Sequence, residues 1–488
     1  MRRAFERFGP RGLEVVYVGP FETEDSCSEW KAEYDLTFPV VPDTDGALFR
    51  RLTSGWVPWS VLVAPNGEVV FSENEFDEAG FSAAIAGMFE EKSAPTPVRA
   101  PAPRRPGPAT IVVLGGGVGG IVAAHRLRKR LGTEHRVVVI DRAPNHLFQA
   151  SLLWLMVGDR REDQIQRPLG RLSRKGIEFI QDEVIEIDLA RRIVRTGETI
   201  PFDYLIVALG AQTVPESIDG FSEMAHDLYS LQGCRDIHDA LTGFSEGKIG
   251  VLVTSMPFKC PAAPYEAAFL VESFLQKRGV RDRAEIHLYT PEHQPMPVAE
   301  AALGQSIATM LRDRGIHYHP LFTFESMRPE AREIVAADGR AERVDLLIAV
   351  PPHRAPDVVR SSGLLGVSGW IHVDPATLRT DHEGVFAIGD VTAIRLPNGK
   401  SLPKAGVFAH NEADVVARQI SGEILGRTSR VAHDGKGHCW IELGGGRAGF
   451  AAGSFYSDPE PRIRMARPGR HWHWAKVAFE AWWLRRWF

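Results

Sequence analysis

The chain has 488 residues, of which 44% are hydrophobic and 24% charged, and its formal net charge is -5. This composition is that of a globular protein and excludes a disordered or collagen-like chain, while the length favours two or three domains. The small net charge argues against nucleic acid as a partner. Four cysteines are too few for a disulfide scaffold, and the N-terminal residues lack the apolar core of a signal peptide. We therefore expect a reducing, cytoplasmic environment.

The first 92 residues are expected to form a small separate unit, because residues 93–108 (SAPTPVRAPAPRRPGP) have the composition of a Pro-rich linker. The unit resembles the rear part of a thioredoxin-like domain, with Val57-Pro58-Trp59 at the usual cis-proline and a turn at residues 65–67. The strand and Cys-x-x-Cys helix of that fold are missing before Arg2. Either the start codon lies inside the domain or the unit is a degenerate docking module, so we expect it to be incomplete and non-catalytic.

A dinucleotide-binding motif follows the linker. The segment 111–127, IVVLGGGVGGIVAAHRL, places Gly115, Gly117 and Gly120 in GxGxxG spacing between a strand and a helix. Glycine permits the tight turn and the close approach of a pyrophosphate to the helix N-terminus. Asp141 ends the next strand, about 20 residues further on, where a carboxylate binds ribose hydroxyls. The sequence therefore predicts an α/β fold that begins with a Rossmann-like domain.

A second Rossmann-like domain is predicted at about residues 247–350, but its nucleotide motif is missing. In the segment 248–275, glycines after the strand are replaced by Ser255, Met256, Pro257 and Cys260. A backbone without glycine cannot approach a pyrophosphate closely, which disfavours NADH binding.

Cys260 is the candidate reactive residue of this segment. It lies just before a helix and beside Lys259, and both a helix N-terminus and an ammonium group favour the thiolate. The alternative is a buried, unreactive cysteine. No histidine has partners at metal-ligand spacing, so no metal site is predicted.

From about residue 109 onward the chain resembles sulfide:quinone oxidoreductase and the flavoprotein subunit of flavocytochrome c sulfide dehydrogenase. The resemblance is carried by GGGVGG with Asp141, NHLFQASLLW (145–154), YLIVALGA (204–211), FKCPAAPYEAAFL (258–270), GVFAIGD (384–390), LPKAGVF (402–408) and AKVAFEAWWLRRWF (475–488). It implies FAD as the cofactor and, over residues 109–430, two Rossmann-like domains of an FAD-dependent oxidoreductase.

The resemblance also implies roles for individual residues and for partners. Gly210, Gly389 and Asp390 are expected to bind FAD, and Lys404 with Gly406 is expected near the flavin pyrimidine, where positive charge stabilises reduced flavin. Electrons are expected to pass from sulfide or another sulfur donor to quinone. A homo-oligomer is also possible.

The family's second flavin-proximal cysteine is missing, since Val391 or a neighbour stands at its place. Three alternatives are open. Cys234, which resembles a more peripheral cysteine of the family, substitutes; Cys260 works alone through a persulfide; or the enzyme uses another reductant. Cys439 has no obvious redox partner in the sequence. Rival interpretations are a type II NADH:quinone dehydrogenase and a redox-docking flavoprotein without small-molecule turnover.

Residues 431–488 form a C-terminal segment that ends in a basic, tryptophan-rich tail. His473, Lys476 and Glu480 fall on one face of its predicted helix, and Trp474 and Trp482 gather elsewhere. This pattern predicts an interfacial anchor on the cytoplasmic face of the cell membrane. Removing residues 471–488 is then expected to release a soluble protein that keeps its flavin. The alternative is a helix packed on its own protein or on a dimer partner.

Overall fold

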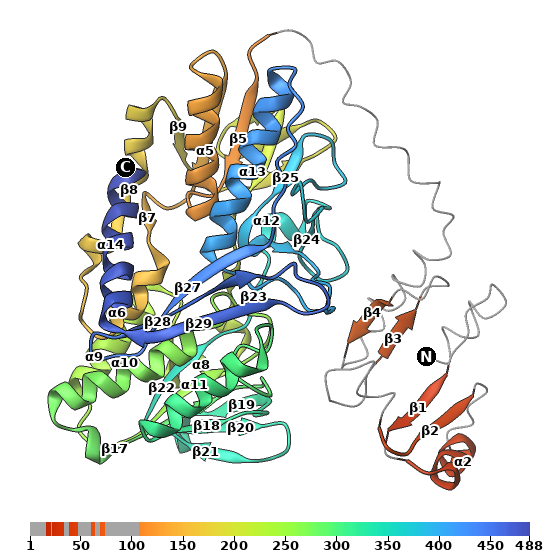
Figure 1. Cartoon of the computed structure of the whole chain (residues 1–488), viewed down its shortest axis with the longest axis vertical. Helices are drawn as coiled ribbons and strands as arrows, with labels where there is room; N and C mark the ends of the chain where they lie inside the picture. Colours follow the sequence, from red (N-terminus) through yellow and green to blue (C-terminus); the bar gives the residue numbers. More distant parts are fainter. Residues whose placement is uncertain (1–15, 21, 34–38, 47–59, 64–68, 74–106) are drawn as a thin grey trace. The chain divides into compact units, whose positions relative to one another are not determined.

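The computed structural model describes residues 16–20, 22–33, 39–46, 60–63, 69–73 and 107–488. The chain divides into two compact units, Met1–Arg105 and Pro106–Phe488. Figure 1 shows the elements of both units in sequence colours.

The described part of the first unit is a small β-α-β arrangement with a separate hairpin. Strands β1 (Tyr17–Pro20) and β2 (Val40–Asp43) pair in parallel on either side of α2 (Glu24–Glu33) in the chain, and β3 (Ser60–Val63) pairs antiparallel with β4 (Val69–Glu73). Cys27 lies buried on α2. The predicted cis-proline position, the turn at 65–67 and most of the linker lie outside the described residues, so the thioredoxin-like assignment stays a prediction.

The second unit contains two five-stranded parallel sheets. The first has the order β25 (Val385–Ala387), β13 (Tyr204–Val207), β5 (Thr110–Leu114), β6 (Arg136–Asp141) and β9 (Glu178–Gln181). Its central strands are continuous apolar runs, as expected of parallel strands buried on both faces. The chain order reverses between β5 and β13, which makes the carboxyl ends of these two strands the place for a ligand.

The second sheet repeats this plan. Its order is β15 (Ala225–Asp227), β22 (Leu346–Val350), β16 (Gly247–Val253), β17 (Ala284–Tyr289) and β18 (Ile316–His319). The chain order reverses between β16 and β22, so the loop after β16, which carries Cys260, again lies at a carboxyl-end crevice. The predicted α/β fold with two Rossmann-like domains is confirmed.

Helices cover these sheets and connect them. The helix α5 (Val118–Leu131) follows β5 and packs on α13 (Gly406–Ile424), while α10 (Ala263–Arg278) follows β16 and is buried along most of its length. A helix that is buried on all sides is part of a hydrophobic core. The core around α10 contains residues of both the second sheet and the C-terminal region. Further α-helices of this unit are α6 (Leu152–Met156), α7 (Glu162–Ile165), α8 (Phe221–Met224), α9 (Leu231–Gly243), α11 (Ala301–Asp313) and α12 (Asp357–Arg360).

Smaller strands extend the two domains. Two antiparallel three-stranded sheets are inserted, β10 (Glu186–Asp188) with β11 (Ile193–Arg195) and β12 (Thr199–Pro201), and β19 (Phe324–Arg328) with β20 (Glu333–Ala336) and β21 (Ala341–Arg343). The two-stranded pairs are β7 (Asn145–Leu147) with β8 (Gln166–Pro168), β14 (Gln212–Thr213) with β23 (His353–Arg354), and β24 (Ile371–His372) with β26 (Thr392–Ala393).

The C-terminal segment forms a third antiparallel sheet and a terminal helix. Strands β27 (Lys436–Glu442), β28 (Ala448–Ser454) and β29 (Arg462–Gly469) pair in chain order, and α14 (Arg470–Arg486) follows directly. In Figure 1, α14 runs beside the short strands β7 and β8. The Trp483 indole is 1% exposed and its Nε1 donates to His146 Nε2 at 3.2 Å.

This packing changes the interpretation of the tail. Trp483 and Trp487 are buried in the apolar cluster that also contains α5 and α13, while Trp474 and Trp482 are 67% and 47% exposed. The helix therefore presents only part of its aromatic surface to the outside. Deleting residues 471–488 would uncover that cluster, so we no longer expect the truncated protein to keep an undisturbed flavin site. No helix in the described ranges is long and apolar enough to cross a membrane.

Candidate functional site

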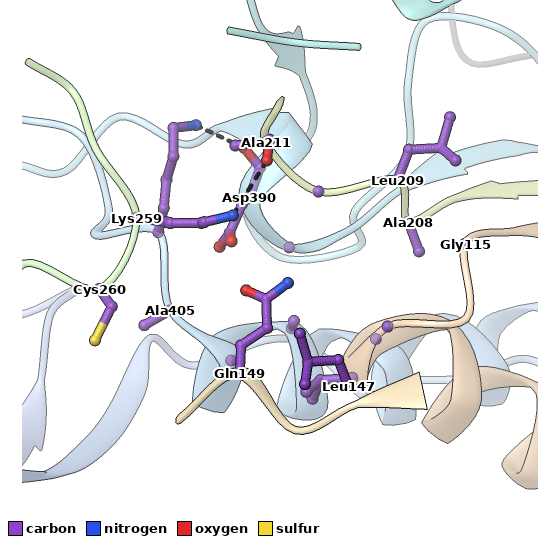
Figure 2. A pocket seen from close by; sticks show the side chains of 18 of the residues that line it. Gly115, Leu147, Gln149, Ala208, Leu209, Ala211, Lys259, Cys260, Asp390 and Ala405 are labelled. Carbon is purple, nitrogen blue, oxygen red and sulfur yellow. Dashed lines mark hydrogen bonds between the residues drawn. The ribbon is translucent and has the colours of Figure 1, made fainter. Parts of the chain in front are cut away.

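A cavity of about 1280 Å³ lies where the carboxyl ends of the two parallel sheets meet the C-terminal segment. This volume exceeds the roughly 300–1,000 Å³ typical of small-ligand pockets, so it has room for more than one small molecule. Its walls come from the loops after β5, β6, β13 and β16, from η7 (Gly389–Val391), from the start of α13, and from β27 and α14. Figure 2 shows part of this cavity.

The glycine loop after β5 forms one wall. Gly115 has φ +104°, and a Cβ there would collide with the carbonyl oxygen of Ala208; a Cβ on Gly120 would collide with the carbonyl oxygen of Gly115. These two glycines let the strand, loop and helix approach closely. A Cβ on Gly117 would meet no protein atom within 4 Å, so at this position the backbone at the start of α5 is open to the cavity.

Asp141, at the end of β6, holds the glycine loop in place. Its Oδ2 accepts a hydrogen bond from Gly116 N at 2.5 Å and its Oδ1 accepts one from Ala143 N at 2.8 Å. Each carboxylate oxygen has two lone pairs, so acceptor capacity remains on the side that lines the cavity.

The other residues that the sequence assigned to the cofactor lie in the same cavity. Its lining includes Gly210 after β13, Gly389 and Asp390 on η7, and Lys404 with Gly406 at the start of α13. Gly120 is the exception, because it is buried beneath the loop. Figure 2 also places Leu147 and Gln149, from the segment 145–154, on the opposite wall.

Two buried lysines surround Asp390. Lys404 Nζ donates to the carbonyl oxygens of Asp390 at 2.7 Å and Thr392 at 3.0 Å, and it lies 3.3 Å from the centroid of the Trp370 ring. Burial lowers the pKa of Lys404 to about 8. Burial raises the pKa of Asp390, and the charges of Lys259 and Lys404 oppose that rise. A cationic region therefore adjoins η7.

The Cys260 loop is tied to the Lys404 loop. Cys260 N donates to the carbonyl oxygen of Lys404 at 2.6 Å, within a parallel bridge between Lys259 and Lys404. Tyr229 Oη donates to the carbonyl oxygen of Lys259 at 2.5 Å. Cys260 itself has φ +49°, a conformation that is uncommon outside glycine. These contacts hold the thiol in the cavity wall.

The expected stabilisation of a Cys260 thiolate is not what the structure shows. Burial raises the pKa of Cys260 well above its usual value, and the neighbouring Cys439 and Glu266 raise it further. In Figure 2 the Cys260 sulfur points away from Lys259, and the charge of Lys259 is not among the main influences on the pKa of Cys260. The resting side chain is therefore a thiol. Its protonation is set by desolvation and not by the adjacent Lys259 or the helix N-terminus.

The other two cysteines of this unit differ in their access to the cavity. Cys234 is fully buried on α9, its Sγ donates to the carbonyl oxygen of Leu228 at 3.3 Å, and it does not line the cavity. Cys439, on β27, does line it together with Cys260. The local sequence around Cys439 does not predict this position, because β27 contacts α10 only through long-range packing.

A network of ionic side chains, two of which line the same cavity, adjoins Cys260 and Cys439. Glu266, in the first turn of α10, accepts from Lys476 Nζ of α14 at 2.8 Å and from Glu442 N of β27 at 3.0 Å. His473 Nδ1 lies 3.0 Å from a carboxylate oxygen of Glu442. Burial lowers the pKa of Lys476, but Glu266 and Glu442 outweigh it and the net shift is upward. Within the described residues, no group of three or more His, Cys, Asp or Glu side chains is placed to hold a metal ion.

Two Rossmann-like domains, a glycine-loop site and a thiol in one cavity define a class of redox enzyme. A family model for pyridine nucleotide-disulphide oxidoreductases matches residues 109–413. The chain belongs to this family and is an FAD-dependent oxidoreductase.

Individual proteins of known name are similar to the same region. The mitochondrial sulfide:quinone oxidoreductase of Mus musculus is 29% identical over 365 residues, which cover 72% of this chain and 79% of the mouse protein. The type II NADH:quinone oxidoreductase of Staphylococcus aureus is 23% identical over 344 residues, covering 65% and 83%. The crystal structure of the sulfide:quinone oxidoreductase from Aquifex aeolicus has the same fold, with a TM-score of 0.71, 24% identity, and coverage of 78% and 91%.

Proposed function

We propose that this enzyme is membrane-associated and passes electrons from sulfide, or another sulfur-containing donor, through FAD to quinone. One observation carries the proposal: Cys260 occupies the loop after β16, where a nucleotide-binding domain needs glycine, and it lines the same cavity as the glycine loop after β5. The similarity to proteins named sulfide:quinone oxidoreductase supports this choice of donor and acceptor.

The residues of the first domain fit FAD. Gly117 leaves backbone N–H groups of α5 open to the cavity, which suits a pyrophosphate, and Asp141 suits ribose hydroxyls. We assign Asp390 and Gly389 to the ribityl side and Lys404 with Gly406 to the pyrimidine side. FAD, when bound, supplies a two-electron acceptor; the protein's part is to bind it, orient it and place positive charge beside it.

The second domain disfavours NADH as the donor. A pyrophosphate needs free backbone N–H groups at the start of the helix. Here Cys260 N is already bonded to the carbonyl oxygen of Lys404, and Ala263 N is bonded to the carbonyl oxygen of Cys260. A thiol in this position instead suits a small sulfur nucleophile.

Steady-state turnover tests this proposal. The purified full-length protein is supplied with a short-chain ubiquinone analogue and with either sulfide or NADH. We expect quinone reduction with sulfide and none with NADH, because only sulfide can react at the Cys260 loop. Turnover with NADH alone would identify a type II NADH dehydrogenase instead, and no turnover with either donor would favour a docking flavoprotein.

The exposed indoles of α14 support peripheral membrane attachment. Trp474 and Trp482 project from the helix, which ends in Arg485 and Arg486, and this combination suits an anionic bilayer surface. Each indole, half immersed, contributes on the order of 1 kcal/mol.

Substitution of both indoles is the corresponding test. We expect Trp474→Ser with Trp482→Ser to weaken binding to phosphatidylcholine–phosphatidylglycerol vesicles by roughly 30-fold, as about 2 kcal/mol requires. Sedimentation measures the bound fraction. Val367→Ser is the control, since Val367 is 62% exposed and lies outside the tail. Equal sedimentation of the double variant and the control would contradict attachment through α14.

A further inference from the structure

We infer that Cys439 is the redox partner of Cys260, so that the second thiol of this site comes from strand β27 of the C-terminal sheet. This assignment rests on the proposed function and deepens it. It also replaces the three alternatives that the sequence left open for the missing partner at Val391.

The first support is position. All three cysteines of this unit contact the same apolar cluster, but only Cys260 and Cys439 line the cavity, whereas Cys234 on α9 is fully buried and absent from the lining. Cys27 belongs to the other unit of the chain. Of the three cysteines in the unit Pro106–Phe488, Cys260 and Cys439 are the two that line this cavity.

The second support is the way in which β27 is fixed to α10. Glu442, three residues after Cys439, donates its backbone N–H to Glu266, six residues after Cys260. Lys476 of α14 bonds to the same carboxylate oxygen of Glu266. These buried bonds hold the strand that carries one thiol against the helix that follows the other.

The electrostatics agree with this proximity. Apart from burial, Cys439 is the largest influence on the pKa of Cys260, which it raises. Lys476 acts in the opposite direction on the pKa of both thiols. The ammonium group of Lys476 therefore stabilises the thiolate form of either cysteine. A redox pair needs this, because a thiolate is the reactive form in disulfide exchange.

The chemistry of such a pair balances. A hydrosulfide ion attacks the Cys260–Cys439 disulfide; the S–S bond breaks, a new S–S bond forms a persulfide on one cysteine, and the other leaves as the thiol or thiolate. A second hydrosulfide takes the outer sulfur away as hydrogen disulfide and leaves two thiols. Closing the disulfide again releases two electrons and two protons, and FAD, when bound as proposed, would supply the two-electron acceptor.

A crosslinking experiment decides the assignment. The purified full-length protein is oxidised with diamide, its remaining thiols are blocked, and its peptides are identified by mass spectrometry. We expect one dominant crosslink, between the peptides of Cys260 and Cys439, because a disulfide forms only when the two Cα atoms lie within roughly 7 Å. The crosslink should be lost in Cys439→Ser and in Cys439→Ala, and kept in Cys27→Ser.

Flavin reduction by sulfide supplies the second readout. Cys439→Ser and Cys439→Ala, each with wild-type circular dichroism, should slow it by roughly a hundredfold or more, whereas Cys27→Ser should not change it. Wild-type protein without the Cys260–Cys439 crosslink, or Cys439 variants that reduce flavin at the wild-type rate, would overturn the assignment while leaving the proposed function intact. If the wild-type protein forms the Cys260–Cys439 crosslink but sulfide does not reduce its flavin, the proposed function would be contradicted and the assignment of the cysteine pair would remain.

Discussion

Cys260→Ser is expected to abolish reduction of the bound flavin by sulfide, with a loss of at least about a hundredfold in rate. A serine hydroxyl cannot form a disulfide or a persulfide, and its oxygen is a far weaker nucleophile than a thiolate. The bound flavin should remain, because the side chain of Cys260 points away from Asp390 and its backbone bond to Lys404 is unchanged by the substitution. Anaerobic stopped-flow absorbance measures the rate, and acid release measures the flavin.

Cys27→Ser is the matched control for this variant. Cys27 is a buried cysteine too, but it lies on α2 of the other unit, and the substitution should leave the rate unchanged. Flavin reduction in Cys260→Ser at the rate of the control would contradict a thiol mechanism at this site.

Lys476→Met is expected to lower the stability of the enzyme by about 3–5 kcal/mol, because it removes one partner of a buried ion pair and leaves Glu266 uncompensated. The pKa of Lys476 is raised in the folded protein, so its ammonium group is charged at neutral pH, and its stabilising contribution is lost only above the normal lysine pKa. Thermal unfolding followed by circular dichroism measures the loss.

The loss of stability in Lys476→Met should become smaller as the pH falls. Burial already raises the pKa of Glu266, and Lys476 opposes that rise; without the ammonium group the carboxyl takes up a proton more readily and becomes neutral. Lys436→Met is the control, since the pair of Lys436 with Asp434 is exposed and contributes only about 0–1 kcal/mol. Similar melting temperatures for the two variants would show that the pair with Glu266 does not stabilise the fold.

The parts of the fold that local sequence dictates could be predicted. Gly115, Gly117 and Gly120 stand in GxGxxG spacing directly after an apolar strand, and the strands β5, β6 and β16 are rich in apolar residues. The absence of glycine between residues 255 and 260 is likewise visible in the sequence. From these patterns follow two Rossmann-like domains and a second crevice without a nucleotide motif.

Features that depend on long-range packing could not be predicted. Lys476 is polar and lies in a basic tail, which suggests an outward side chain, yet Glu266 and Glu442 turn it into the core. Cys260 follows a lysine and precedes a helix, but burial outweighs both in setting its pKa. Cys439 carries no signal at all, because only the packing of β27 against α10 brings it to the cavity.

An anaerobic titration of the oxidised holoenzyme tests the central claim most directly, namely that the crevice of the second domain serves a sulfur donor instead of a nicotinamide nucleotide. Sulfide and NADH are added separately, in equal amounts, while the flavin absorbance is followed. We predict that sulfide bleaches the flavin, that NADH leaves it oxidised, and that quinone restores the absorbance. Bleaching by NADH while sulfide has no effect would contradict the account.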